Sequence, residues 1–281
     1  MATLAGVYAV DRYVRTPEQI VAALFRDGPR SQQADRPGPQ FKHLRGCFAR
    51  AYDTDTDEPT VVPGAFEAFA WAEGEVASRL RAEQPLIRLM DGQRSLWDAA
   101  AACLESAPAE RTIDILDILH VSQYVWRAAK VLQTHFEHRE AFARERLLRI
   151  LRGEVHRVIS GLRQMATKRP LSAQARREIT TVCGYLENNA HRMRYDEYLR
   201  KGYPIATGVI EGACRHLVKD RMERSGMRWR LPGAQAMLNV RAVFLSSYWE
   251  DFHTWRIKRE QRELHPNRGT IAGYTPVPLV A

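Results

Sequence analysis

Two acidic residues of this 281-residue chain stand in surroundings that suit a divalent metal ion. Asp91 follows a short apolar run, and Glu211 begins a segment dense in arginine and lysine. Carboxylates that a fold brings together can bind Mg²⁺, which proteins hold with few carboxylates and with phosphate oxygens of the substrate. Two such ions stabilise the attacking and leaving oxygens of an in-line phosphoryl displacement. These residue types therefore indicate chemistry on a phosphodiester.

The basic residues after Glu211 suit a polyanionic partner. They are Arg215, Lys219, Arg221, Arg224, Arg228 and Arg230. The whole chain carries a formal net charge of +9, which favours nucleic acid without bearing on the fold. We expect these side chains to neutralise DNA phosphates without reading bases. Two plainer interpretations stay open: Glu211 and Arg215 form an i,i+4 ion pair worth about 0.3–0.5 kcal/mol, or the arginines are solvated surface.

Asp117 and His120 form a second candidate pair, because they close the apolar run from Thr112 to His120. Both candidate sites have structural alternatives. Asp91 and the glycine after it make a good turn sequence, and a histidine next to leucine is more often structural than a ligand. Position adds weight to the functional interpretation, because strands that alternate with helices collect ligand-binding groups at their carboxyl ends.

Three further patterns narrow the function classes. Asp53, Asp55 and Asp57 alternate like the start of a calcium loop, but the glycine and distal glutamate of an EF-hand are missing. The cysteines are scattered and form no close pairs, so we expect reduced, mostly buried thiols in a cytoplasmic protein; they are Cys47, Cys103, Cys183 and Cys214. No apolar run approaches the ~18 residues of a membrane span, so we expect a soluble protein without a membrane partner.

Hydrophobic periodicity predicts the elements that must position these residues. A strand–helix alternation from 86 to 136, with strands at Leu86–Met90 and Thr112–His120, favours a βαβ arrangement. An early strand, "TLAGVYAV", precedes a helix that Thr16 caps and Pro17 begins. A second strand is predicted at "FKHLRGCFARAY", and helices are predicted over 65–83 and from 123 to about 198.

The segment from 208 to 230 is predicted to be one helix, capped by Thr207. Its apolar face comprises Ile210, Cys214, Leu217 and Val218. After Gly226 the chain is expected to restart as a helix headed by Pro232, and the tail from Arg268 is expected to be poorly ordered.

Several segments of the chain resemble the ISKra-type insertion-sequence transposases, relatives of the Mutator group. The segments are "LMDGQRSLW", "ILDILHVSQYVWRAA", "MRYDEYL", "GYPIATGVIEGACRHLVKDRMERSGMRWR" and "GAQAMLNVRAVF". The resemblance implies an α/β fold with a ribonuclease-H-like core and a large all-helical insertion. It also implies a D, D, E triad that holds two Mg²⁺ (or Mn²⁺) ions, in which Asp91 is the second aspartate and Glu211 the glutamate.

The same resemblance gives Asp117 and His120 the place of a (C/D)-x-x-H signature. It further implies double-stranded DNA as substrate, at the element ends and at the target, a homo-oligomer in the active state, and a nucleoid-associated bacterial protein. The expected organisation is a partial core over 1–120, a helical insertion over 121–206, the catalytic-glutamate helix and its successors over 207–262, and a tail over 263–281.

One departure from the family pattern bears on activity. The first aspartate of the triad belongs to a strand whose hairpin partner resembles "TLAGVYAV", so that strand and the upstream DNA-binding region are expected before Met1. Asp11 follows "TLAGVYAV", which corresponds to the second strand of the family fold, and is a poor substitute. We therefore expect a truncated transposase that is inactive alone and has unpaired strand edges. The alternatives are a non-catalytic DNA-binding remnant that acts through its basic helix, and a decayed reading frame.

Overall fold

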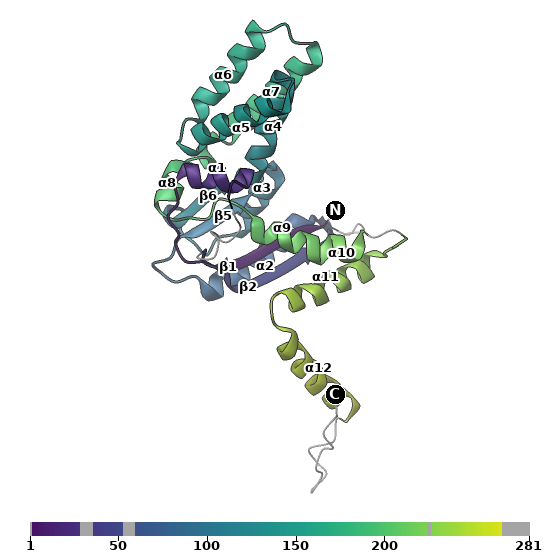
Figure 1. Ribbon diagram of the computed structural model, residues 1–281. Coiled ribbons are helices and arrows are strands. Elements are labelled where there is room, and N and C mark those ends of the chain that lie inside the picture. Colours follow the sequence, from purple (N-terminus) through teal and green to yellow (C-terminus); the bar gives the residue numbers. More distant parts are fainter. Residues whose placement is uncertain (1, 29–35, 53–59, 224–225, 266–281) are drawn as a thin grey trace.

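The computed structural model describes residues 2–28, 36–52, 60–223 and 226–265 (Figure 1). The described chain is α/β, with small two-stranded sheets and many helices. None of the described helices combines the length and the apolar character needed to cross a membrane. Cys47 and Cys183 are buried free thiols, and Cys103 and Cys214 are partly exposed free thiols.

The first sheet consists of two antiparallel strands from the N-terminal part of the chain. β1 (Thr3–Ala9) pairs antiparallel with β2 (Gln40–Cys47), with a register irregularity between Val7 and Ala9. Between them lies α1 (Pro17–Phe25), and its N-terminus is the predicted one. The Thr16 hydroxyl accepts from the Gln19 amide at 3.2 Å, while the Gln19 side chain accepts from the Thr16 amide at 2.9 Å, so a capping box fixes the start.

The predicted second strand is in fact two strands. β2 ends at Cys47, and β3 (Arg50–Tyr52) turns away to pair with β4 (Thr60–Val62). α2 (Gly64–Arg79) follows and packs on β1 and β2. Its small buried residues, among them Ala68 and Ala72, let the helix lie close to the sheet.

The predicted βαβ unit is confirmed. β5 (Leu86–Met90) and β6 (Thr112–Leu116) are parallel, and α3 (Arg94–Cys103) connects them. The predicted extension of β6 to His120 is wrong, because α4 (Ile118–Leu132) begins at Ile118 and Asp117 is its N-cap. His120 therefore lies in the first turn of a helix.

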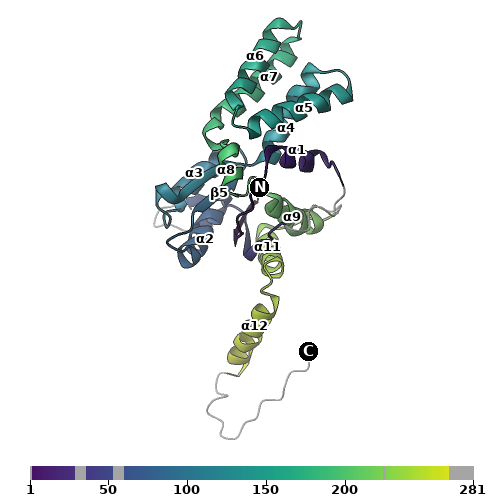
Figure 2. The same ribbon diagram turned by 60° about the vertical axis from the view of Figure 1, so that its left-hand side comes forward.

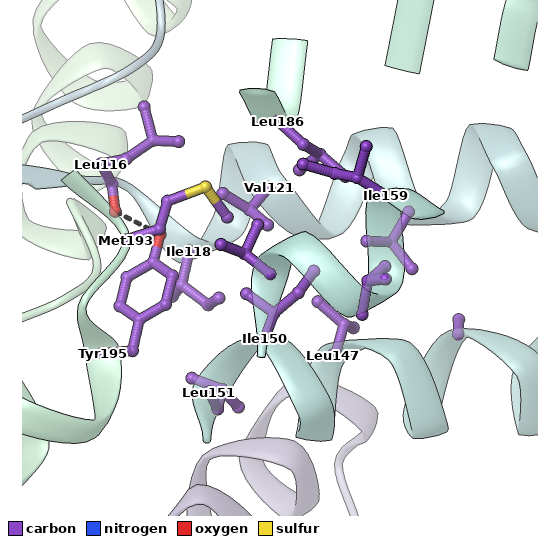
Figure 3. Packing of buried hydrophobic residues seen from close by; sticks show 14 of the residues in the cluster. Leu116, Ile118, Val121, Leu147, Ile150, Leu151, Ile159, Leu186, Met193 and Tyr195 are labelled. Carbon is purple, nitrogen blue, oxygen red and sulfur yellow. Dashed lines mark hydrogen bonds between the residues drawn. The ribbon is translucent and has the colours of Figure 1, made fainter. Parts of the chain in front are cut away.

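A helical block without strands follows, as predicted from 123 onward. Its further helices are α5 (Phe136–Leu151), α6 (Val155–Lys168), α7 (Ala173–Asn188) and α8 (Tyr195–Arg200). Figure 3 shows its apolar core, which extends from β6 through α4 to α8 and includes Leu116, Ile150 and Leu186. The Tyr195 hydroxyl donates to the Leu116 carbonyl at 2.7 Å, so the block is anchored on β6. α4 continues across the boundary expected at residues 120 and 121.

The segment after the block is not one helix, contrary to prediction. α9 (Gly208–Cys214) continues as a π-helical turn, η4 (Arg215–Lys219), and then as α10 (Asp220–Met222). Gly226, at φ 81°, lies in the stretch that precedes α11 (Leu231–Leu245). The predicted apolar face is confirmed for Ile210, Leu217 and Val218, which join a second core cluster with Leu44 and Leu238.

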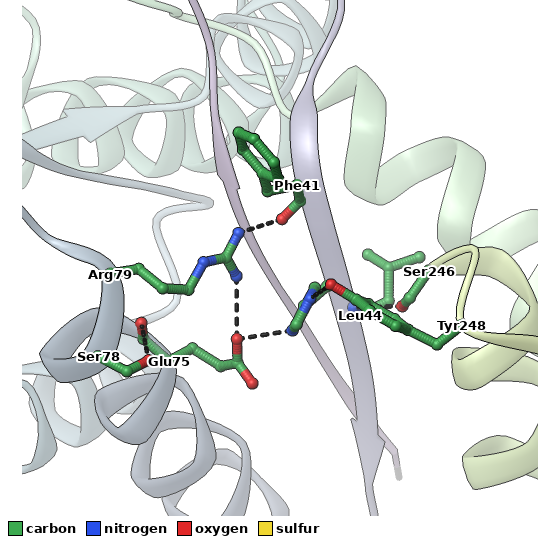
Figure 4. A network of polar contacts seen from close by, with 8 residues as sticks. Phe41, Leu44, Glu75, Ser78, Arg79, Ser246 and Tyr248 are labelled. Carbon is green, nitrogen blue, oxygen red and sulfur yellow. Dashed lines mark hydrogen bonds and ion pairs between the residues drawn. The ribbon is translucent and has the colours of Figure 1, made fainter. Parts of the chain in front are cut away.

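Polar contacts tie the turn between α11 (Leu231–Leu245) and α12 (Trp249–Leu264) to the first sheet (Figure 4). The Ser246 hydroxyl accepts from the Leu44 amide at 2.9 Å, and Tyr248 contacts His43. Glu75 of α2 accepts from His43 at 2.6 Å and from Arg79 at 2.9 Å. Beyond these contacts α12 projects from the body, as Figures 1 and 2 both show. None of its residues is buried.

Candidate metal and nucleic-acid site

A groove of about 1940 Å³ lies between the first sheet and the βαβ unit. All of β1 and all of β5 line it, and α2 and the start of α9 contribute further residues. The sequence-predicted residues on its lining are Asp11, Asp91, His120, Glu211, Arg215 and Lys219. The fold thus places Asp91 and Glu211, which are 120 positions apart in the sequence (211 − 91), on the lining of one groove.

Asp91 is held at the end of β5 by two hydrogen bonds of its own turn. Its Oδ1 accepts from the Gln93 amide at 2.8 Å, and its carbonyl accepts from the Trp97 indole at 2.7 Å. Trp97 is buried, and the Arg192 guanidinium lies 4.0 Å from its ring centroid. The tryptophan of "MDGQRSLW" therefore fixes the backbone of the aspartate, a role that sequence reasoning had not assigned.

Gly92 is packed against the helical block. A Cβ atom at this position would lie 2.3 Å from Cε2 of Tyr185, a separation that real side chains do not show. Tyr185 of α7 is stacked on Tyr124 of α4, with ring centroids 3.6 Å apart. Burial raises the pKa of Tyr185, and the charges of Tyr124 and Asp91 raise it further. Only the tertiary structure reveals this contact, because 92 and 185 are remote in sequence.

Asp117 is fully buried and all its contacts are structural. Its Oδ1 accepts from the Leu119 amide at 2.9 Å, and its Oδ2 contacts His120 Nδ1 at 3.2 Å and accepts from the Thr207 hydroxyl. Thr207 is the N-cap residue of α9, as predicted, but its side chain makes no capping hydrogen bond there. The Thr207 hydroxyl donates to the Asp117 carboxylate instead, and this hydrogen bond links the start of α4 to the start of α9.

His120 contacts Asp117 and lies within the electrostatic influence of Asp91 and Glu211. Its side chain is 33% exposed and lines the groove. The hydrogen bond to Asp117 raises its pKa, burial opposes this, and the negative charges of Asp117, Asp91 and Glu211 add to the rise. The Nδ1 contact with Asp117 leaves Nε2 of the ring for another partner.

Glu211 lies in the first turn of α9, and its side chain is exposed to the groove. Among the described ion pairs none involves Glu211, so the i,i+4 pair with Arg215 is not formed. The backbone amide of Glu211 donates to the Thr207 carbonyl at 2.9 Å. The neighbouring residue Ile210 packs against Gly6 of β1. A Cβ atom on residue 6 would lie 2.6 Å from Cδ1 of Ile210. A glycine in β1 thus seats the helix that carries the glutamate.

The predicted basic residues do not share one face. Arg215 and Lys219 lie at the two ends of the π-helical turn and line the groove. Arg228 and Arg230 are exposed in the stretch before α11. Arg224 lies outside the described residues, and the side chain of Arg221 does too. A π-helical turn is uncommon and is frequent at functional sites.

Asp91 and Glu211 fit a hard divalent cation better than the other acidic residues do. Among the described contacts, no group donates to Asp91 Oδ2 or to the Glu211 carboxylate, whereas Asp117 is saturated by hydrogen bonds. Asp11 accepts from the Gln40 side chain at 3.0 Å. Within the described residues no three acidic, histidine or cysteine side chains are grouped as a metal site. Asp53, Asp55 and Asp57 lie outside the described residues.

Comparisons with known proteins add no relative to this picture. No protein-family model matches the sequence, no curated protein matches it, and no solved structure matches the fold.

Proposed function

We propose that this protein is a DDE-type DNA transposase chain in which Asp91 and Glu211 are two of the three metal-binding carboxylates. The observation that supports this best is that both carboxylates line one groove with His120, although one follows a strand and the other begins a helix far along the sequence. The motif resemblance supplies the reaction class, which is strand cleavage and transfer in DNA transposition.

The proposal gives distinct roles to the residues around the groove. Asp91 and Glu211 would hold Mg²⁺, which when bound stabilises the attacking and leaving oxygens of a phosphoryl displacement. His120, whose pKa is raised, donates from Nε2 to a phosphate oxygen. Asp117 and Thr207 fix the position of His120 relative to α9 and do not touch substrate. Trp97 and Tyr185 hold the turn that carries Asp91.

DNA binding in this proposal depends on the groove-lining cations of the π-helical turn. Arg215 and Lys219 lie on the same helical segment as Glu211, so a phosphate near the carboxylates is also near both cations. Such contacts position the backbone and carry no base specificity. They also release counterions, so affinity falls with salt.

A second candidate is a non-catalytic DNA-binding protein that uses the same cations. One observation favours it: within the described residues no third carboxylate joins Asp91 and Glu211, and misplacing a metal ion costs orders of magnitude in rate. In both candidates the chain binds DNA. The two differ in whether Glu211 and Asp91 bind a metal ion.

The first test is a DNA-binding titration at several salt concentrations with a double variant, Arg215→Ala/Lys219→Ala. Each lost phosphate contact reduces the slope of log affinity against log salt by about 0.9, so the variant should have a slope shallower by about 2. The matched control is Arg157→Ala/Lys168→Ala, which removes the same charge from α6 in the helical block. Equal slopes for both variants would refute the assignment of Arg215 and Lys219.

The second test separates the two candidates. Mn²⁺ binding, followed by water proton relaxation, should be weakened at least tenfold in Glu211→Gln and in Asp91→Asn, with DNA binding nearly unchanged. Glu110→Gln is the control, because Glu110 is an exposed glutamate outside the groove. If wild type binds Mn²⁺ no better than Glu211→Gln while DNA binding persists, the protein is a binder without a metal site.

A further inference from the structure

Arg192, in the short helix η3 (Ala190–Arg192), links the helical block to the turn that carries Asp91. Its guanidinium carbon lies 4.0 Å from the centroid of the Trp97 ring. Trp97 is buried, and its indole N–H donates to the Asp91 carbonyl at 2.7 Å. Two successive contacts therefore join a cation of the helical block to the backbone of a candidate metal ligand.

The same end of the block contacts this turn at a second point. Tyr185 packs against Gly92, as described above. Asn189 joins that contact to Arg192, because its Nδ2 donates to the Tyr185 carbonyl at 2.9 Å and its Oδ1 accepts from Arg192 Nη1 at 3.2 Å. Asn189 is itself buried. Residues 185–192 thus hold the turn at Gly92 and at Trp97 together.

The surroundings of Arg192 give its charge little compensation. Asp114 already accepts two hydrogen bonds from Arg88, at 2.6 and 2.9 Å, and it lies 3.9 Å from Arg192 Nε. Within the described part of the chain Arg192 Nε has no hydrogen-bond acceptor, and burial lowers the pKa of the guanidinium. A desolvated cation with weak partners is often no more stabilising than an apolar side chain of similar volume. Stability alone therefore does not account for an arginine at this position.

A guanidinium over Trp97 offers something that an apolar side chain does not. The ring quadrupole attracts a cation, and more strongly when the cation is desolvated. The guanidinium is also planar and stacks on aromatic faces. Arg192 can therefore fix the plane of the indole ring, and with it the direction of the N–H that holds the Asp91 carbonyl. Groups that orient a metal ligand in this way matter, because losing one typically lowers metal affinity about 10–100-fold.

We propose that Arg192 is a positioning residue for Asp91, and that the helical block sets the metal affinity of the groove through Trp97. Arg192 touches neither the metal ion nor the substrate. The effect on metal affinity rests on the proposed function. The positioning of the Asp91 turn does not, because it is measurable without a metal ion.

The first experiment compares Mn²⁺ binding by the full chain in wild type and in Arg192→Met. If Arg192 acted by charge alone, its removal would tighten Mn²⁺ binding, because like charges repel. Loss of positioning has the opposite sign and should weaken binding about 10–100-fold. Arg94→Met is the control for charge, because the Arg94 side chain is 93% exposed at the start of α3, and this variant should not weaken Mn²⁺ binding.

A double-variant cycle tests whether Arg192 acts through Trp97. Trp97→Phe removes the indole donor and should itself weaken Mn²⁺ binding. In that background Arg192→Met should add little further loss, because the two residues act in one chain of contacts. Arg192→Lys keeps the cation without the plane and should recover part of the affinity. Tighter Mn²⁺ binding in Arg192→Met, or losses that simply add in the double variant, would overturn the proposal.

Hydrogen exchange followed by NMR in EDTA tests the positioning without metal. The probes are the Trp97 indole N–H and the Gln93 amide, which donates to Asp91 Oδ1 at 2.8 Å. Both should exchange faster in Arg192→Met, whereas amides of α6 should not change. If Arg192→Met does not fold in a urea titration, Arg192→Lys takes its place, with a smaller change in the same direction.

The two readouts fail separately. Exchange that stays at the wild-type rate for both probes would overturn the positioning role, whatever happens to Mn²⁺ binding. If wild type binds no Mn²⁺ but both probes exchange faster in the variant, the proposed metal function fails and the positioning of the Asp91 turn stands.

Discussion

Replacing Asp117 with alanine should destabilise the protein by more than the loss of a helix cap. The carboxylate accepts from the Leu119 amide and the Thr207 hydroxyl and contacts His120, at a position with no exposure to solvent. Loss of an N-cap side chain costs about 1 kcal/mol. A buried hydroxyl left without its acceptor costs about 1–3 kcal/mol more. The expected loss in the free energy of unfolding is therefore about 2–4 kcal/mol.

The assay is thermal and urea unfolding, with Thr16→Ala as the matched control. Thr16 caps α1 through the same kind of bond but is exposed, so its loss should cost only about 1 kcal/mol. The Thr207→Val variant removes the shared hydroxyl without changing the side-chain shape much. Because Asp117 and Thr207 share one hydrogen bond, the double variant should be less unstable than the sum of the singles.

Two results would refute this reasoning. If Asp117→Ala costs no more than Thr16→Ala, the buried contacts contribute nothing beyond capping. If the two substitutions at 117 and 207 add without coupling, the bond that links α4 to α9 is not formed. The same variants report on function, since a freed α9 should weaken Mn²⁺ binding by Glu211.

Three further outcomes are expected. Gly92→Ala should lower the free energy of unfolding, measured in urea, by about 1–3 kcal/mol, because the added Cβ would clash with the Tyr185 ring. Adding Tyr185→Leu should recover part of this loss. Full stability of the Gly92→Ala single variant would contradict the contact. The pKa of His120 is raised in the folded protein. Without bound metal, in EDTA, protonated His120 therefore stabilises the fold fully at pH values below the unfolded-state pKa of about 6.5. This stabilisation is lost as the pH rises through the higher folded-state pKa. His120→Gln should flatten the pH dependence of Tm in that window, and an unchanged profile would rule the linkage out. Leu217→Ala, at a site with no exposure in the second core, should cost about 2–5 kcal/mol in unfolding free energy, and a loss below about 1 kcal/mol would mean that the cluster is loosely packed.

Local patterns were enough for several elements. The apolar run at Leu86–Met90 and the Thr16–Pro17 pair mark a strand and a helix start, because periodicity and capping act within a few residues. Position 117 shows where this fails. The run from Thr112 reads as strand through His120, yet the carboxylate of Asp117 satisfies the Leu119 amide and begins a helix there.

The candidate site divides in the same way. Asp91 and Glu211 were identifiable from their surroundings and from the motif resemblance. Their place on one groove with His120, and the contacts of Trp97 and Tyr185 with the Asp91 turn, depend on packing that has no sequence signature.

The sequence by itself determined the residue types that suit metal and phosphate, the βαβ unit and the helical block, since these follow from chemistry and short-range periodicity. Tertiary structure alone decided that the Thr207 side chain donates to Asp117 instead of making a capping bond, that Glu211 forms no ion pair with Arg215 among the described contacts, and that β1 and β5 line one groove. The physical reason is that each of these outcomes is a competition among partners distant in the chain, and only packing brings the competing groups within reach.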